Sequence, residues 1–220
     1  ASPILILVND QSDNPFGTYY GQILRAEGLN AFQMGRLSAI GDAPLEWYDT
    51  VLLTEGPVRD IELDRLKQYV VEGGNLVAMR PDGALAALCG LELAGGETSD
   101  GYVRVNASHL VGTGMATDPM QFHGPARHYR LIAAEEVCFL ASDRDAQQGY
   151  PAIAVNQTGK GKAGAWSYDL AKSIILMRQG NPALADVPSP EWDGVRPVNL
   201  FVNWVDLECA NLPQADEQQR

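Results

Sequence analysis

The chain has 220 residues, of which 45% are hydrophobic, and it suits one compact domain that buries roughly 70% of its unfolded surface. Its formal charge is -12, from 28 acidic and 16 basic side chains. Such a surface repels phosphate backbones and anionic lipids, so we expect neither a nucleic-acid partner nor membrane binding. The sequence also has no apolar run near the roughly 18 residues that a membrane span needs.

The ends of the sequence indicate a part of a longer protein, and its cysteines indicate structural thiols. A strand begins almost at once, and the last residues, PQADEQQR, resemble a helix cut short, so we expect residues 1–220 to be a single domain from a longer protein. The three cysteines are widely spaced and form no CxxC pair, which argues against a disulfide framework or a metal site. Cys89 and Cys138 lie among apolar residues, and we predict buried structural thiols.

In the first eighty residues, apolar strands alternate with amphipathic helices. The run PILILV at 3–8 is continuously apolar, as in a central parallel strand that is covered on both faces. The elements expected after it are a helix at 17–27, a strand at 31–34, a strand at 49–54, a helix at 60–72 that ends at Gly73-Gly74, and a strand at 75–79. This alternation predicts an α/β fold with a doubly wound, mostly parallel sheet.

The pattern changes after residue 90, where Gly, Thr, Ser and Asp become frequent. Short β-like runs at 102–105, 137–140 and 152–155 indicate a β-rich insertion or an antiparallel extension of the sheet. A turn at 158–162 leads into a last strand at 163–168, and Asp169 is expected to cap a helix at 170–178. The proline-rich stretch 183–197 is expected to be an irregular surface segment.

The unit LKQYVVEGGNLVAMRPDG, residues 66–83, resembles the class I glutamine amidotransferase-like superfamily, which implies a flavodoxin-like fold. Within that superfamily it is similar to the noncatalytic middle domains of family 42 β-galactosidases. Three further segments are similar to the N-terminal domain of uncharacterised, exported, multidomain bacterial proteins: NPFGTYYGQILRAEGLN (14–30), QFHGPARHY (121–129) and AWSYDLAKSIILMRQGNP (165–182). These resemblances imply an extracellular, glycan-linked setting.

The same resemblance indicates where catalytic residues of the superfamily would stand. Active members carry a Cys on a strained turn after a strand, and this sequence has Arg80-Pro81-Asp82 there. They carry a catalytic His after the last strand, where this chain has Tyr168-Asp169. The resemblance therefore implies that the chain is not an active glutamine amidotransferase. We assign it no catalytic residue, no metal and no cofactor.

In an open parallel sheet, ligands bind outside the carboxyl ends of the strands. Acids, amides, an Arg and a Tyr follow the expected strands, and together they offer the donors and acceptors that sugar hydroxyls or another small polar ligand require. The candidate ligand-binding residues are Asn9, Asp10, Asn14, Glu55, Arg80, Asp82, His123, Tyr168 and Asp169. The alternative is that these side chains cap helices and pin loops.

Two histidines and one tryptophan leave further alternatives open. His123 and His128 are spaced for neither one helical face nor a zinc motif, so we expect loop histidines with structural hydrogen bonds. A hydrolase acting on a glycan or an amide would instead pair His123 with Asp82 or Asp169 as acid-base groups. Trp192, which is flanked by acids, suits a sugar platform and a domain interface equally well.

These features favour a noncatalytic amidotransferase-like module of a larger bacterial protein, which serves domain packing, oligomerisation or carbohydrate-associated binding. Its expected partners are other domains of the same polypeptide, with a carbohydrate or further copies of the chain as alternatives. We expect an exported or extracellular location from the resemblance, with the cytoplasm as the alternative. The competing hypothesis is the hydrolase with carboxylate and histidine acid-base groups.

Overall fold

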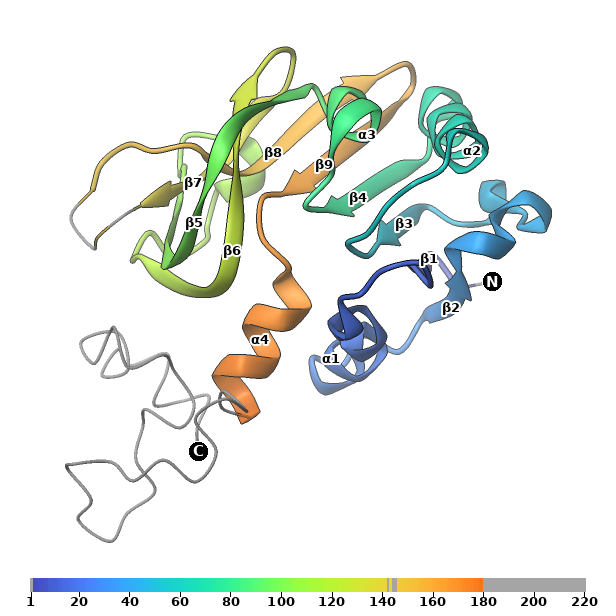
Figure 1. Ribbon diagram of the computed structural model, residues 1–220, viewed down its shortest axis with the longest axis horizontal. Helices are drawn as coiled ribbons and strands as arrows, with labels where there is room; N and C mark the ends of the chain where they lie inside the picture. Colours follow the sequence, from blue (N-terminus) through green and yellow to red (C-terminus); the bar gives the residue numbers. More distant parts are fainter. Residues whose placement is uncertain (1, 142, 144–145, 180–220) are drawn as a thin grey trace, which may run out of the picture.

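The computed structural model describes residues 2–141, 143 and 146–179 (Figure 1). Its strands are β1 (Ile4–Val8), β2 (Phe32–Arg36), β3 (Thr50–Leu53), β4 (Asn75–Met79), β5 (Leu91–Val105), β6 (Met120–Leu131), β7 (Glu135–Ala141), β8 (Pro151–Thr158) and β9 (Gly161–Trp166). Its α-helices are α1 (Tyr20–Ala26), α2 (Asp60–Glu72), α3 (Gly83–Leu88) and α4 (Leu170–Gln179). The α/β character is confirmed. Residues 183–197, with Trp192 among them, lie outside the described residues, so the predictions for this stretch stay predictions.

One mixed sheet joins the nine described strands in the order β2-β1-β3-β4-β9-β8-β7-β5-β6. The pairings from β2 across to β9 are parallel, and those from β9 across to β6 are antiparallel. The prediction of a mostly parallel sheet is therefore wrong. Of the two alternatives for the residues after 90, the antiparallel extension is confirmed and the separate insertion is wrong. The predicted runs at 102–105, 137–140 and 152–155 lie in β5, β7 and β8, which extend the same sheet beside β9.

Helices lie on both faces of the parallel half of the sheet (Figure 1). Successive side chains of a strand point to opposite faces, and β1 shows this directly. Leu5 and Leu7 pack into the core that includes Leu66 of α2, whereas Ile6 packs into the core that includes Ile175 of α4. Burial on both faces explains why this strand is apolar at every position.

The antiparallel half curls back over the end of β9. The backbone N–H of Arg127 in β6 donates to the carbonyl of Ser167, which follows β9, at 2.8 Å. Helix α4 lies against β6, and strands β5, β6, β7 and β8 share a core of their own, against which Leu170 of α4 packs. In that core the rings of Phe122 and Tyr168 stack with their centroids 5.0 Å apart. The curvature therefore brings β5 and β6 beside the carboxyl ends of the parallel strands.

Smaller sequence predictions are also settled by the structure. Cys89 and Cys138 are both buried, as predicted. Burial raises the pKa of the Cys89 thiol to about 12 and that of Cys138 to about 11, so neither is a thiolate at neutral pH. The turn at 158–162 is the hairpin between β8 and β9. Within the described ranges, no helix combines the length and the apolar character that crossing a bilayer requires.

Candidate functional site

Arg80 occupies a strained turn directly after β4. Its φ is 45°, in the left-handed region, and among the described residues only Asp100 is another non-glycine residue with positive φ. Such a conformation costs about 1–3 kcal/mol and persists only where the surroundings hold it. The Arg80 N–H donates to the carbonyl of Trp166 at 2.8 Å, which fixes the turn to β9. The strained turn expected from the amidotransferase resemblance is present, with an arginine on it.

The guanidinium of Arg80 is held between two carboxylates. It forms ion pairs with Glu55, which follows β3, and with Glu97 of β5. The side chains of Arg80 and Glu55 are only 11% and 15% exposed, so water screens this pair weakly. Arg127 of β6 also contacts this turn. Its Nη1 donates to the Arg80 carbonyl at 2.6 Å and lies 3.6 Å from Oδ2 of Asp82.

Asn14 continues these contacts to the start of α4. Its amide donates to Glu55 at 2.8 Å and to Asp169 at 2.6 Å. Asp169 also accepts from the N–H groups of Ala171 at 2.9 Å and Lys172 at 3.3 Å, so the predicted helix cap is confirmed. We call the connected set the carboxyl-edge clasp; it consists of Asn14, Glu55, Arg80, Asp82, Glu97, Arg127 and Asp169.

The Asp169 carboxyl has a raised pKa. Burial is the main cause, and the hydrogen bond from Asn14 opposes it. The folded protein therefore keeps the proton at a pH where the unfolded chain has lost it. The contribution to stability is full below the ordinary value of 3.8 and is lost as the pH rises through the folded-state pKa.

An Asp169→Asn variant tests this pH dependence, because asparagine cannot ionise. We expect the stability of the natural protein to fall relative to the variant as the pH rises from about 4 to 7. Urea unfolding of both proteins at each pH measures the difference, and a constant offset from changed hydrogen bonds does not affect its slope. A difference that stays constant over this range would show that Asp169 ionises normally.

Four of the predicted ligand-binding residues lie outside the clasp. Asn9 is buried and committed to structure, since its N–H donates to the Thr54 hydroxyl and its amide to the Pro57 carbonyl, both at 2.8 Å. Asp10 is exposed and accepts from the Ser38 hydroxyl at 2.6 Å. Tyr168 follows the carboxyl end of β9 as expected, but its ring is buried in the antiparallel half, where it stacks on Phe122.

The fourth residue, His123, and its neighbour His128 lie in strand β6 and not in a loop as predicted. The Gly124-Pro125 step between them interrupts the strand pattern, and this is why β6 was not recognised. His123 is 2% exposed, and its Nδ1 lies 3.4 Å from Asp100. His128 contacts the Thr98 hydroxyl at 2.8 Å and stacks on Tyr150.

Sequence reasoning missed two members of the clasp, Glu97 and Arg127. Both come from the antiparallel half, whose strand pairing the sequence did not reveal. Their charges are visible in the sequence, but only the curl of β5 and β6 brings them to Arg80. Tyr20 was missed as well: its hydroxyl accepts from the Ala171 N–H at 3.3 Å, and burial together with Asp169 raises its pKa well above 10.0.

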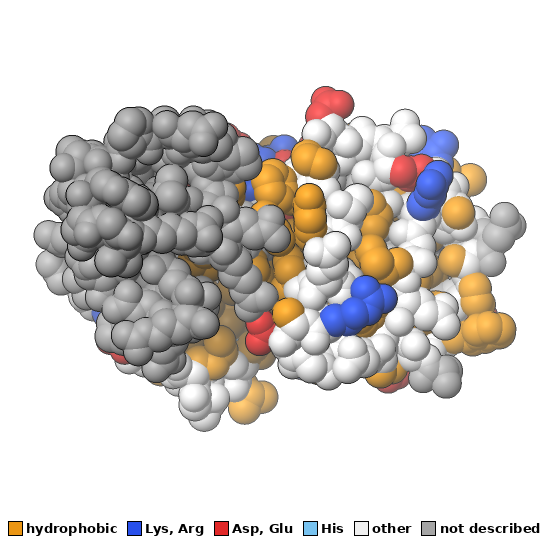
Figure 2. All heavy atoms as spheres, turned by 90° about the horizontal axis from the view of Figure 1, so that it is seen from below, with side chains coloured by type: hydrophobic (Ala, Val, Ile, Leu, Met, Phe, Trp, Pro, Cys, Tyr) orange, Lys and Arg blue, Asp and Glu red, His pale blue; other side chains and the backbone are white. Residues whose placement is uncertain are grey.

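The charged side chains of the described residues were compared with the needs of a metal ion and of a polyanion. In the described part of the chain, no three His, Cys, Asp or Glu side chains are grouped to hold a metal ion. Seen from below, the Lys and Arg side chains that are visible among the described residues are few and scattered, with hydrophobic side chains between them (Figure 2). The clasp itself contains four carboxylates and two guanidinium groups, and none of its members is a Cys, Ser or Thr of the kind that acts as nucleophile in acyl transfer.

Comparison with known proteins identifies the fold of the chain. No protein-family model matches the sequence, and no curated protein matches it. Solved structures do match. A cold-adapted β-galactosidase from Rahnella sp. R3 has a TM-score of 0.63 and 18% identity, over 79% of this chain and 30% of that enzyme. An exo-β-1,4-mannosidase from an Opitutaceae bacterium has a TM-score of 0.60 and 15% identity, over 80% and 32%.

A shorter protein matches over most of its own length. The ThuA-like protein from Bacteroides uniformis has a TM-score of 0.56 and 13% identity, over 76% of this chain and 81% of that protein. By contrast, the chain spans about a third of the glycosidases that it matches. ThuA-like proteins have a glutamine amidotransferase-like fold. The chain therefore has an α/β fold that it shares with glycosidase domains and with ThuA-like proteins.

Proposed function

We propose that this chain is a noncatalytic, doubly wound, amidotransferase-like module of a larger carbohydrate-associated protein. The observation that carries the proposal is the turn at Arg80. A backbone strained in the way that suits a nucleophile holds a guanidinium instead, and that guanidinium is committed to Glu55 and Glu97. Arginine stays protonated and does not act as an acyl-transfer nucleophile.

Other groups needed for amide hydrolysis are also missing from this turn. Pro81, the next residue, has no N–H to contribute to an oxyanion hole. The nearest cysteine in sequence, Cys89, is 0% exposed, and its Sγ faces the carbonyl of Gly164 at 3.8 Å. Tyr168, where the superfamily has a histidine, is packed against Phe122. In their place the clasp ties the parallel half to β5 and β6, which supports a packing role.

The proposed partners and setting are argued from the matching structures. Solved structures that match the chain over about a third of their length include a β-galactosidase and a mannosidase. This supports a module beside other domains of one polypeptide, with a carbohydrate or further copies of the chain as alternative partners. An exported location remains part of the proposal. Nothing favours the competing hydrolase, because His123 faces Asp100 and not Asp82 or Asp169.

An assay of glutamine hydrolysis tests the proposal. Glutamate release is measured for the natural chain, for Cys89→Ala and for Arg80→Cys, which restores a thiol on the strained turn. We expect no release above the rate without protein in any of the three, since the natural turn has no nucleophile and the Arg80→Cys turn still has no histidine as general base. Turnover by the natural chain that Cys89→Ala abolishes would overturn the noncatalytic assignment.

A further inference from the structure

The two faces of the sheet are covered to different extents at β3 and β4. The side chains that point toward α2 are at most 1% exposed: Val51, Leu53, Leu76 and Ala78. Leu52 and Val77 point to the other face, on whose side α1 and α4 lie (Figure 1), and both stay partly exposed. Because parallel strands are usually buried on both faces, the described elements leave part of this second face uncovered.

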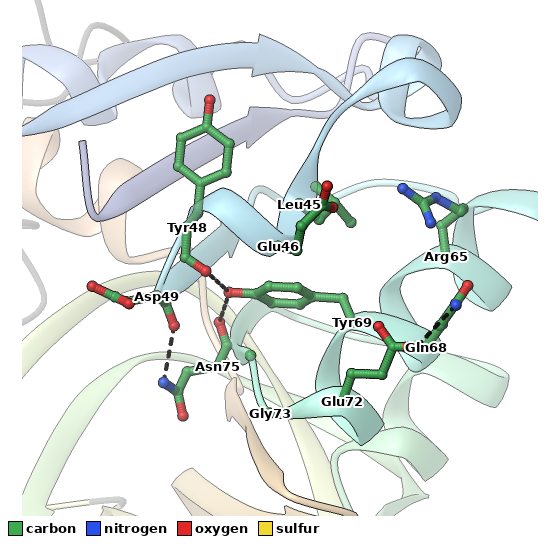
Figure 3. A pocket seen from close by; sticks show the side chains of 11 residues that line it. Leu45, Glu46, Tyr48, Asp49, Arg65, Gln68, Tyr69, Glu72, Gly73 and Asn75 are labelled. Carbon is green, nitrogen blue, oxygen red and sulfur yellow. Dashed lines mark hydrogen bonds between the residues drawn. The ribbon is translucent and has the colours of Figure 1, made fainter. Parts of the chain in front are cut away.

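Helix α2 closes its own face as far as the amino ends of these strands. Where β3 and β4 begin, the ring of Tyr69 lies across a small polar pocket (Figure 3). Tyr69 is 6% exposed, and its hydroxyl donates to the Tyr48 carbonyl at 2.9 Å. The Asn75 amide donates to the Asp49 carbonyl, also at 2.9 Å. These groups already have partners within the fold, so this end of the face needs no further cover.

Helices α1 and α4 cover the opposite face incompletely. They meet where they begin, since the Ala171 N–H donates to the Tyr20 hydroxyl at 3.3 Å. In the core that they share, Ile6 and Met79 are 0% and 2% exposed. Figure 2 views the molecule from this side and shows hydrophobic side chains at its surface. Three further residues of the central strands stay partly exposed here, and we call them the open face: Ile4, Leu52 and Val77.

The open face has the width of one helix. Neighbouring strands lie about 4.8 Å apart, so β1, β3 and β4 span about 10 Å from the first to the third. Packed helices lie about 8–10 Å from their neighbours. The three residues of the open face are aliphatic, so only an apolar surface suits them. A single amphipathic helix would therefore cover them together.

The chain continues from α4 into residues 180–220, which lie outside the described residues. Within them, the sequence PVNLFVNWVDLECANL at 197–212 predicts an amphipathic helix about 24 Å long. Pro197 suits its first turn and Pro213 follows its end. Polar residues recur on one side, at 199, 203 and 206. The apolar residues on the opposite side recur at helical spacing: Val198, Phe201, Val202, Val205, Cys209 and Leu212.

We propose that residues 197–212 form a helix that packs on the open face, with this apolar stripe against Leu52 and Val77. Helix α4 ends at Gln179 and already borders this face, because its Ile175 packs in the same core as Ile6. The 17 residues from 180 to 196 extend to at most about 56 Å, so the helix can reach the face from there. A segment of the same chain is also present at a high effective concentration. The open face is then taken by the chain itself, and other domains bind elsewhere on the module.

Paramagnetic broadening of amide resonances in the isotope-labelled full chain tests where residues 197–212 lie. A nitroxide is attached at Asn203→Cys, on the polar side of the predicted helix, while Cys209→Ala removes the natural thiol nearest in sequence. Cys89 and Cys138 are buried and stay unlabelled. We expect residues 50–53 and 75–78 to lose most of their signal intensity, and the intensity should return when the nitroxide is reduced.

Two variants that add the same charge supply the controls. Phe201→Asp puts a carboxylate on the apolar stripe, where its burial would be costly, and it should abolish the broadening. Asn199→Asp puts the carboxylate on the polar side and should leave the broadening unchanged. The other resonances of each variant report whether it folds.

Three outcomes overturn the proposal. Residues 50–53 and 75–78 that keep their intensity, or that are broadened equally in Phe201→Asp, would exclude this segment from the open face. In a further sample, nitroxide-bearing chain without isotopes is mixed with isotope-labelled chain without nitroxide, and we expect no broadening. Broadening in that mixture would show that a second copy of the chain covers the face instead.

Discussion

Replacing Glu55 by alanine is expected to lower the free energy of unfolding by about 2–3 kcal/mol. The change leaves the Arg80 guanidinium, which is only 11% exposed, with Glu97 as its one remaining ion-pair partner. It also removes an acceptor of the Asn14 amide. The cost is large because removal of one partner leaves the charge of the other buried. Urea unfolding at neutral pH measures the change in the free energy of unfolding.

An exposed ion pair between β5 and β6 provides the control. Glu92 and Arg130 lie 3.4 Å apart, but their side chains are 56% and 61% exposed. Glu92→Ala should therefore cost less than about 0.5 kcal/mol, since water screens exposed pairs. If Glu55→Ala were as mild as Glu92→Ala, the clasp would contribute nothing to stability beyond an ordinary surface pair.

Gly161→Ala is expected to lower the free energy of unfolding by about 3 kcal/mol. Gly161 begins β9 and lies against the turn that ends α2. A Cβ there would lie 2.1 Å from the Gly74 carbonyl oxygen and 2.4 Å from that of Val70. Both are backbone atoms, so no change of rotamer relieves the contact, and the β8–β9 hairpin would have to move away from α2.

Gly41→Ala is the matched control for this substitution. An added Cβ at Gly41 meets nothing within 4 Å. We expect stability within about 0.5 kcal/mol of the natural protein, or slightly above it because the unfolded chain becomes less flexible. Thermal or urea unfolding of both variants gives the comparison. A Gly161→Ala protein as stable as Gly41→Ala would mean that the close approach of β9 to α2 is not required.

The parallel half could be predicted from the sequence because its elements are local. β1 is apolar at every position, and α2 ends at Gly73, whose φ of 128° few other residues adopt. Of the antiparallel half, the sequence indicated runs that lie in β5, β7 and β8, but neither β6 nor the way in which the strands pair. Its strands depend on pairing between distant segments, and β6 contains a Gly-Pro step that indicates a loop when considered alone.

The candidate site shows the same division. Asn14, Glu55, Arg80, Asp82 and Asp169 were expected at the carboxyl ends of the strands, and all five belong to the clasp. Whether they bind a ligand remains a prediction. Glu97 and Arg127 could not be placed, since their positions follow from the curl of β5 and β6.

A double-mutant cycle between Glu55 and Arg80 tests most directly whether the strained turn now serves as a structural clasp. Unfolding free energies are measured for the natural chain, Glu55→Ala, Arg80→Met and the double variant. We predict a coupling energy above about 1 kcal/mol, because each side chain satisfies the buried charge of the other. Effects that add to within about 0.3 kcal/mol would contradict the clasp and leave Arg80 without a structural role at this turn.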